Sequence, residues 1–128
     1  MFLDTSIIID ILTVQSTSDQ FKKIFSLIKD EPLYISVIQL GELSDWCFKN
    51  NVEVNNRITQ IKKIVTIIPL DESICLHGSK IKHAHRTQGN KKFSLIDGFI
   101  LASAISVDEN LLTKDIDFNN CSQAIVLS

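Results

Sequence analysis

The sequence predicts an α/β fold: one domain over residues 1–128 with a five-stranded parallel sheet and helices on both faces. Short apolar segments, partly β-branched, alternate with longer amphipathic segments, and this alternation is typical of strand–helix–strand units. The length of 128 residues suits one hydrophobic core, and an apolar content of 45% is enough to fill it. No linker, repeat or low-complexity stretch divides the chain.

The first predicted strand covers residues 1–3 and ends at Asp4, which two hydroxyl residues, Thr5 and Ser6, follow. A buried carboxylate is costly unless it is hydrogen-bonded, paired or bound to a metal. We therefore expect Asp4 at the carboxyl end of a central strand, where open α/β sheets place their ligands. The apolar residues 7–12 that come next predict a short helix of one or two turns.

Helix-capping patterns predict where several later helices begin. Ser18 precedes apolar residues at helical spacing, so a helix is expected from there to the residues before Pro32. Ser36 is followed three residues later by Gln39, which is the spacing of a capping box. The other elements are expected as strands over 33–35, 65–70, 111–113 and 124–127 and as helices over 37–49, 54–64, 72–85 and 95–106.

Four acids lie near strand ends or helix starts: Asp4, Glu42, Asp97 and Asp115. If the first and fourth strands are neighbours where the strand order reverses, Asp4 and Asp115 open into one crevice. Asp97 falls in the first turn of its helix, where the free amides favour a negative charge. Each of these three has a purely structural explanation as a cap or turn former, whereas Glu42 lies near an apolar helix face and needs a partner.

Acids packed together without a cation repel one another and raise one another's pKa values. Mg²⁺ and Mn²⁺ are hard ions that take oxygen ligands, and they relieve this repulsion. Such a centre binds a phosphodiester, generates hydroxide and stabilises the leaving oxygen. The chain has no Gly-x-Ser-x-Gly elbow and no cysteine with an obvious histidine partner, so covalent catalysis is the weaker hypothesis.

The net charge and the cysteines say more about the cellular compartment than about the substrate. The net charge is −2, but setting aside five acids in a metal centre leaves ten acids against 13 basic residues, or +3, so the charge alone decides nothing. Three scattered cysteines indicate a reducing, cytoplasmic environment. No stretch approaches the roughly 20 apolar residues of a membrane span, and we expect neither a membrane anchor nor a secretory signal.

Four blocks of the sequence, in register, resemble the successive motifs of the PIN-domain family, and the length is most similar to its VapC-type toxin ribonucleases. The blocks are MFLDTS at 1–6, SVIQLGEL at 36–43, SLIDGFILASA at 94–104 and LLTKDIDF at 111–118. The resemblance spans nearly the whole chain. Gly41 and Gly98 depart from it slightly, because the family often has a larger small residue there, and this departure questions the rigidity of the two helices.

The resemblance implies a Mg²⁺- or Mn²⁺-dependent endoribonuclease that acts on an RNA substrate. Its catalytic and metal-binding acids fall on Asp4, Glu42, Asp97 and Asp115, and accessory positions fall on Thr5, Ser6, Thr113 and Asp117. It also implies a homodimer and a separate antitoxin protein as inhibitor. Two alternatives within the family stay open: an RNA-processing nuclease without an antitoxin, and a non-catalytic interaction module.

Basic residues are concentrated just before Asp97, and four of them are weaker candidates for guiding RNA phosphates: Lys82, Arg86, Lys91 and Lys92. The equally good alternative is an ordinary solvated helix face and loop. The sequence has no aromatic RNA-binding motif that would predict which base is recognised.

Overall fold

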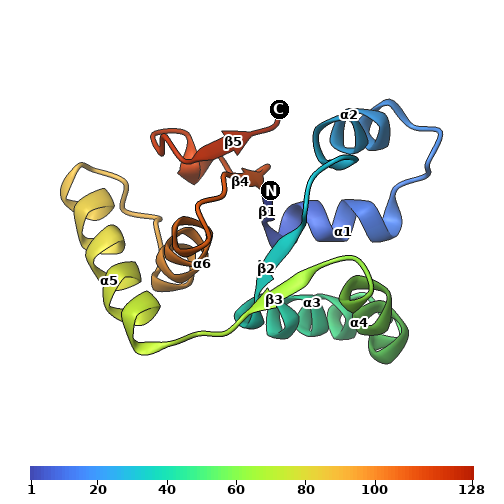
Figure 1. Ribbon diagram of the computed structural model, residues 1–128, viewed down its shortest axis with the longest axis horizontal. Helices are drawn as coiled ribbons and strands as arrows, with labels where there is room; N and C mark the ends of the chain where they lie inside the picture. The colour runs from blue at the N-terminus through green and yellow to red at the C-terminus, as the bar shows by residue number, and fades with distance from the viewer.

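Five parallel strands form one sheet in the order β3-β2-β1-β4-β5 in the computed structural model, which describes residues 1–128 (Figure 1). The strands are β1 (Phe2–Leu3), β2 (Tyr34–Ser36), β3 (Thr66–Ile68), β4 (Leu111–Thr113) and β5 (Ala124–Val126). Every neighbouring pair is parallel. The predicted fold class is confirmed, and β1 and β4 are indeed neighbours at the centre, where the strand order reverses.

The helices are α1 (Thr5–Thr13), α2 (Asp19–Ile28), α3 (Val37–Lys49), α4 (Val54–Lys62), α5 (Glu72–Thr87) and α6 (Leu95–Ser106), with a 3₁₀ turn η1 (Ile116–Phe118). Figure 1 shows α1 to α4 on one side of the sheet and α5 and α6 on the other. Two buried apolar clusters match these layers. Leu3 and Leu112 belong to the cluster under α1 to α4, whereas Phe2 and Leu111 belong to the cluster under α6, because successive strand residues face opposite ways.

Local capping explains why the helices next to the strand ends begin where the sequence predicted. Ser36 and Gln39 form a complete capping box at the start of α3. Ser94 and Asp97 form a second capping box at the start of α6. Each box satisfies backbone amides that have no partner inside the helix, which fixes the first turn directly after β2 and after the loop that precedes α6.

Several boundaries differ from the sequence-based predictions. The first helix is longer than predicted: it begins at Thr5, so Thr5 and Ser6 lie in its first turn and Asp4 is its N-cap residue. Helix α4 ends at Lys62, which leaves Ile64 outside it and exposed rather than on its buried side. Helix α6, in contrast, has the predicted bounds and ends at Ser106, and the chain then turns at Asp108 with a φ of 55°.

Helices α5 and α6 approach each other most closely at two glycines, Gly78 and Gly98. A Cβ atom built on Gly98 overlaps the carbonyl oxygen of Gly78, and one built on Gly78 lies 2.7 Å from Cδ1 of Phe99. Gly98 therefore permits tight packing of the two helices, which explains why a larger residue is absent at this position. No helix of the structure has both the length and the hydrophobicity to cross a membrane.

Candidate metal centre

Asp4 lies at the end of the central strand, as the sequence predicted. Its backbone amide donates a hydrogen bond to the carbonyl of Leu112 over 2.9 Å, which ties it to β4. Its carboxylate accepts hydrogen bonds from the hydroxyls of Thr113, at 2.5 Å, and Ser6, at 3.3 Å. Burial, to 8% exposure, raises the pKa of Asp4, and these hydrogen bonds oppose the rise without cancelling it.

Thr113 joins the ends of the two central strands. Its side-chain oxygen donates to Asp4 and accepts a hydrogen bond from the backbone amide of Asp115 over 3.0 Å. The hydroxyl of Ser6 accepts a similar bond from the amide of Lys114 over 3.2 Å. The predicted hydroxyl residues therefore fix the turn after β4 against the start of α1, which directs Asp115 toward the same edge as Asp4.

Glu42 reaches this edge from α3. The hydroxyl of Thr5 donates to Oε1 of Glu42 over 2.7 Å. Burial raises the pKa of Glu42, and the negative charges of Asp4 and Asp97 raise it further. The hydroxyl of Thr5 is thus the partner that Glu42 was expected to need beside its apolar helix face.

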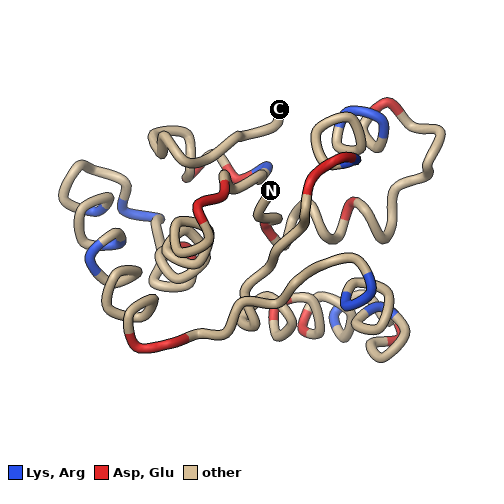
Figure 2. Tube along the Cα trace, viewed as in Figure 1, with Lys and Arg blue, Asp and Glu red and all other residues tan.

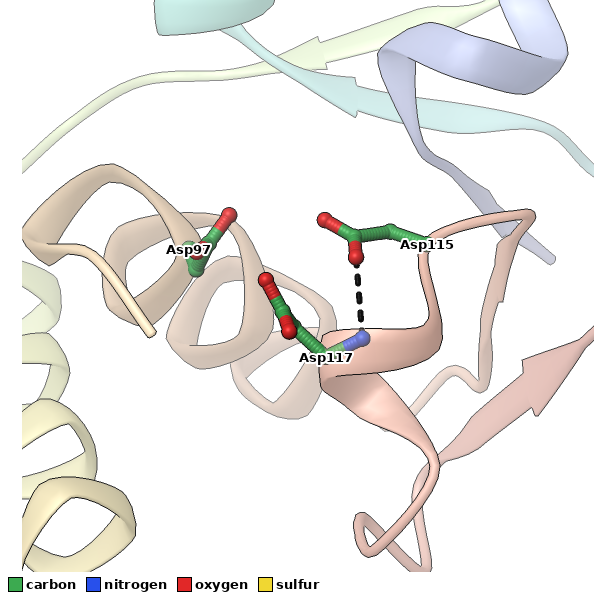
Figure 3. A group of neighbouring side chains, drawn as sticks. All are labelled: Asp97, Asp115 and Asp117. Carbon is green, nitrogen blue, oxygen red and sulfur yellow. Dashed lines mark hydrogen bonds between the residues drawn. The ribbon is translucent and has the colours of Figure 1, made fainter. Parts of the chain in front are cut away.

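The tightest group of carboxylates consists of Asp97, Asp115 and Asp117, whose oxygens lie within 4.8 Å of one another. Figure 3 shows Asp97 reaching from α6 toward Asp115 and Asp117, which come from the chain at η1. Asp115 accepts a hydrogen bond from the amide of Asp117 over 2.9 Å, and Asp97 accepts one from the amide of Ser94 over 2.8 Å. Burial raises the pKa of Asp97, as do the charges of Asp115 and Asp117.

These residues fit a hard divalent cation. Oxygens on opposite sides of an octahedral Mg²⁺ are about 4.2 Å apart, since each lies about 2.0–2.1 Å from the ion. One oxygen from each of the three carboxylates lies within 4.8 Å of the others, so rotations of the side chains that bring these oxygens closer together would accommodate the ion. All the donors are oxygens. Burial raises the pKa values of Asp4, Glu42 and Asp97, and neighbouring negative charges raise them further, so a cation bound here would stabilise the ionised carboxylates.

The structure brings the four predicted acids to one edge of the sheet, but the three that lie closest together are not the three that were expected. Asp4 lies near enough to Asp115, and Glu42 near enough to Asp4 and Asp97, for their charges to affect one another's pKa values. The closest triplet, however, contains Asp117, which the sequence ranked only as accessory, and leaves out Asp4 and Glu42. The turn η1, which the sequence analysis did not predict, is what brings Asp117 round to Asp97.

Two supporting residues were missed by the sequence analysis. Gln39 is fully buried, and its amide donates to the carbonyl of Leu3 over 2.6 Å, so the capping residue of α3 also anchors the strand that carries Asp4. Asp10 is buried and forms an ion pair with Lys114 over 2.7 Å. A single acid within the apolar stretch 7–12 was the available sequence signal for Asp10.

The basic candidates lie on α5 and in the chain between α5 and α6, where Figure 2 shows lysines and arginines. Lys91 and Lys92 are exposed, and Lys82 is half-buried. Arg86 lies within α5 rather than in the predicted loop, and its Nε donates to the carbonyl of Phe93 over 2.9 Å. Arg86 therefore fixes the approach to α6 in addition to carrying charge.

Comparison with known proteins gives one family. The family model described as PIN domain matches residues 1–123. No curated protein sequence gives a significant match. Solved structures with the same fold include a toxin–antitoxin complex from Klebsiella pneumoniae, which is 20% identical with a TM-score of 0.75, over 98% of this chain and 95% of that chain.

Two further structures with this fold contain DNA. One is FitAB bound to the IR36 DNA fragment, 25% identical with a TM-score of 0.74, over 98% of this chain and 92% of that chain. The other is VapBC2 from Rickettsia felis bound to a DNA fragment from their promoter, 21% identical with a TM-score of 0.66, over 98% of this chain and 96% of that chain.

The fold and the site define a class of protein: a parallel α/β domain with acids gathered at the edge where the strand order reverses. The family match covers residues 1–123 of the 128, and the chain belongs to the PIN-domain family.

Proposed function

We propose that this protein is a Mg²⁺- or Mn²⁺-dependent endoribonuclease and the toxin of a toxin–antitoxin pair. The observation that carries the proposal is the gathering of Asp97, Asp115 and Asp117 within 4.8 Å, beside Asp4 and Glu42. Membership of the PIN-domain family supports a nuclease. The toxin–antitoxin complexes among the similar structures support the biological role.

Asp97, Asp115 and Asp117 would hold the metal directly, and Asp4 would hold it directly or through water. A bound divalent cation would supply charge neutralisation at the scissile phosphate and acidify a water molecule. The residues of the chain then have separable tasks. Ser94 and Thr113 keep Asp97 and Asp4 in place through hydrogen bonds, so the carboxylates are positioned before substrate arrives.

Glu42 is the best candidate for a general base. Its pKa is raised by burial and by the neighbouring acids, which brings it nearer the range in which a carboxylate accepts a proton efficiently at neutral pH. The hydroxyl of Thr5 donates to one carboxylate oxygen of Glu42, so it orients the group. In this scheme Glu42 takes a proton from the attacking water, whose oxygen bonds to phosphorus as the bond from phosphorus to the 3′ oxygen breaks. The products are a 5′ phosphate and a 3′ hydroxyl, which takes its proton from solvent.

The proposed function also implies which molecules the protein binds. We infer an RNA substrate, an antitoxin protein as inhibitor, a homodimer and a cytoplasmic location. Exposed apolar side chains on the helices support protein–protein contact, and Phe48 on α3 is 72% exposed. Light scattering on the purified chain measures the oligomeric state, and co-expression with a candidate antitoxin shows whether a stable complex forms.

RNA cleavage by the purified protein tests the enzymatic proposal, with Mg²⁺ or Mn²⁺ and with a chelator. We expect cleavage only with the metal, and a loss of at least about 100-fold in Asp97→Asn, as for a residue that binds or orients a metal. Asp45→Asn is the matched control, since Asp45 is an exposed acid on α3 paired with Lys49. Cleavage that survives the chelator, or a folded Asp97→Asn protein of wild-type activity, would contradict the proposal.

Two outcomes would favour the alternatives. Metal-dependent cleavage without any antitoxin complex would favour an RNA-processing nuclease. A folded protein that binds a partner but cleaves no RNA with either metal would favour a non-catalytic module.

A further inference from the structure

A polar hollow of about 450 Å³ lies directly beside the acidic cluster. Its walls come from the end of α5 and the following turn, with Gln88 and Asn90, and from η1 and the residues after it, with Asn119 and Asn120. Asp117 belongs both to this hollow and to the triplet of carboxylates that lie within 4.8 Å of one another. A group seated in the hollow is therefore next to the proposed reaction centre.

The chemistry of the walls indicates a neutral, hydrogen-bonding ligand. Four of the eight lining residues are amides, each of which offers an N–H donor beside a C=O acceptor, and Asp117 is the one acid. Neither lysine nor arginine lines the hollow, so it does not fit a phosphate group. Its volume lies in the range of about 300–1,000 Å³ that is usual for small-molecule sites.

Two further residues in the walls of the hollow favour the binding of a ligand with a flat ring. Ile116 is 73% exposed at the hollow, which is unusual for a large apolar side chain. The ring of His85 also lines it and is stacked on Phe93, with centroids 4.2 Å apart and planes at 7°. An apolar side chain and an imidazole beside several amides form the kind of surface on which single-stranded RNA bases stack and are read.

The two walls are connected, so the hollow has a defined shape. The amide of Asn90 donates to the backbone carbonyl of Asp117 over 2.8 Å, which links the turn after α5 to η1. His85 Nε2 lies 3.4 Å from Sγ of Cys121, which links α5 to the chain after η1. Gln88, Asn119 and Asn120 are exposed on these connected walls and free to meet a ligand.

We propose that this hollow is a nucleobase subsite that selects adenine next to the bond that is cut. An amide pairs best with a donor that lies beside an acceptor. All four bases present such a pair on their Watson–Crick edge, but only adenine presents a second one on its Hoogsteen edge, so only adenine pairs with an amide through either edge. Guanine presents two adjacent acceptors on its Hoogsteen edge, which suit arginine or lysine instead. The cleavage readout of this inference rests on the proposed nuclease function, whereas the binding readout does not.

Binding tests the subsite separately from catalysis. Short RNAs of adenine, cytosine or uracil are titrated into the metal-free protein, and fluorescence anisotropy measures the dissociation constants. Without metal, repulsion by the acids weakens the binding of all three RNAs alike. The ratios of their dissociation constants therefore report the base preference of the hollow. We expect adenine to bind about tenfold more tightly, as for one good amide–base pair, and the preference to disappear in the double variant Asn119→Ala/Asn120→Ala.

The matched control is Asn56→Ala/Gln60→Ala. These amides line a second polar hollow, of about 300 Å³, on α4, at the opposite end of the molecule from α5 (Figure 1). This variant should keep the preference of the wild type. Equal affinity for the three RNAs, or a preference that survives in Asn119→Ala/Asn120→Ala, would overturn the subsite.

Cleavage of RNAs that differ only at the nucleotide beside the scissile bond gives the second readout. The wild type should cut the adenine-containing RNA fastest, and Asn119→Ala/Asn120→Ala should slow that RNA selectively. Absence of all cleavage, together with retained adenine-selective binding, would refute the nuclease but support the subsite. Cleavage without any base preference would refute the subsite and leave the nuclease standing.

Discussion

The hydroxyl of Thr113 forms hydrogen bonds with two acids of the candidate centre that are far apart in the sequence. It donates to the carboxylate of Asp4 over 2.5 Å and accepts from the amide of Asp115 over 3.0 Å. Thr113 is fully buried, so this hydroxyl is held away from water between the two groups. The consequence is that one small side chain sets both the position of Asp4 and the direction of the turn toward Asp115.

Thr113→Val should therefore weaken both stability and metal binding. The variant removes the partner of the Asp115 amide and one of the partners of the Asp4 carboxylate, which lowers the free energy of unfolding by about 1–3 kcal/mol. Affinity for Mn²⁺ should fall by about 10–100-fold, as is typical when a supporting hydrogen bond is lost. Urea unfolding and calorimetric titration measure the two effects. Thr113→Ser keeps the hydroxyl and should behave like the wild type, and equal behaviour of the two variants would contradict this role.

Glu42 gives a prediction with a definite dependence on pH. Its pKa in the folded protein is raised by burial and by Asp4 and Asp97, so folded Glu42 keeps its proton to a higher pH than unfolded Glu42 does. Between these two pKa values the folded state binds more protons, and the free energy of unfolding therefore falls as the pH rises through that window. The stabilisation by the protonated form is present below the ordinary carboxyl range, about pH 4, and is lost above the raised value.

Glu42→Gln should thus raise the melting temperature of the metal-free protein at pH 7, and the gain should shrink toward pH 4. Thr5 can still donate to the amide oxygen of the new side chain, so little else changes. Differential scanning calorimetry in chelator measures the effect. Asp45→Asn, on the exposed side of the same helix, is the control and should not show the gain. A lower melting temperature for Glu42→Gln at pH 7 would contradict anionic crowding.

At the scale of elements, two helix glycines beside candidate acids have opposite roles. Gly41 precedes Glu42 in α3, and a Cβ built there has no atom within 4 Å. Gly98 follows Asp97 in α6, and a Cβ there meets the backbone of α5. A glycine beside a candidate acid is therefore required by packing in α6 and not in α3.

Alanine substitution should separate these roles. Gly41→Ala should stabilise the protein by about 0.5–1 kcal/mol, because alanine lowers the conformational entropy of the unfolded chain. Gly98→Ala should destabilise it by about 1–3 kcal/mol, because α5 and α6 must separate to admit the methyl group. Chemical denaturation measures both changes. Stabilisation by Gly98→Ala would show that the helices part without penalty and would contradict the close contact.

The helices were predicted more accurately where local signals govern them. The capping boxes at Ser36 and Ser94 act over three residues, and the helices that follow them, α3 and α6, have the predicted bounds. Helix α1 was predicted too short because its N-cap, Asp4, makes no side-chain capping bond and gave no such signal. The turn η1 was missed because a single 3₁₀ turn of three residues leaves no periodicity to detect.

At the scale of the whole molecule, charge is distributed unevenly. The acids of the candidate centre face the edge at β1 and β4, and lysines and arginines lie on α5 and in the chain leading to α6, as well as on α2 and around α4 (Figure 2). Such an arrangement attracts a polyanion to the basic side and leaves the acids to bind a cation.

The variant Lys91→Glu/Lys92→Glu should bind RNA more weakly whatever its sequence, and the salt dependence of binding should become shallower by about two units of slope. Dissociation constants at several salt concentrations measure both effects. Lys62→Glu/Lys63→Glu is the matched control, since this pair lies at the end of α4, away from the candidate centre. If both pairs change the slope equally, the attraction is a general property of the surface and not of the α5–α6 side.

The sequence by itself determined the alternation of elements, the helix starts at Ser36 and Ser94 and the placement of acids after strands or near helix starts, because periodicity and capping act between near neighbours. The tertiary structure alone decided that Asp117 joins Asp97 and Asp115, that Thr113 reaches Asp4 across 109 positions, and that a polar hollow opens beside them. The physical reason is that strand order and the path of short turns set these distances, and neither leaves a pattern among residues that are adjacent in the chain.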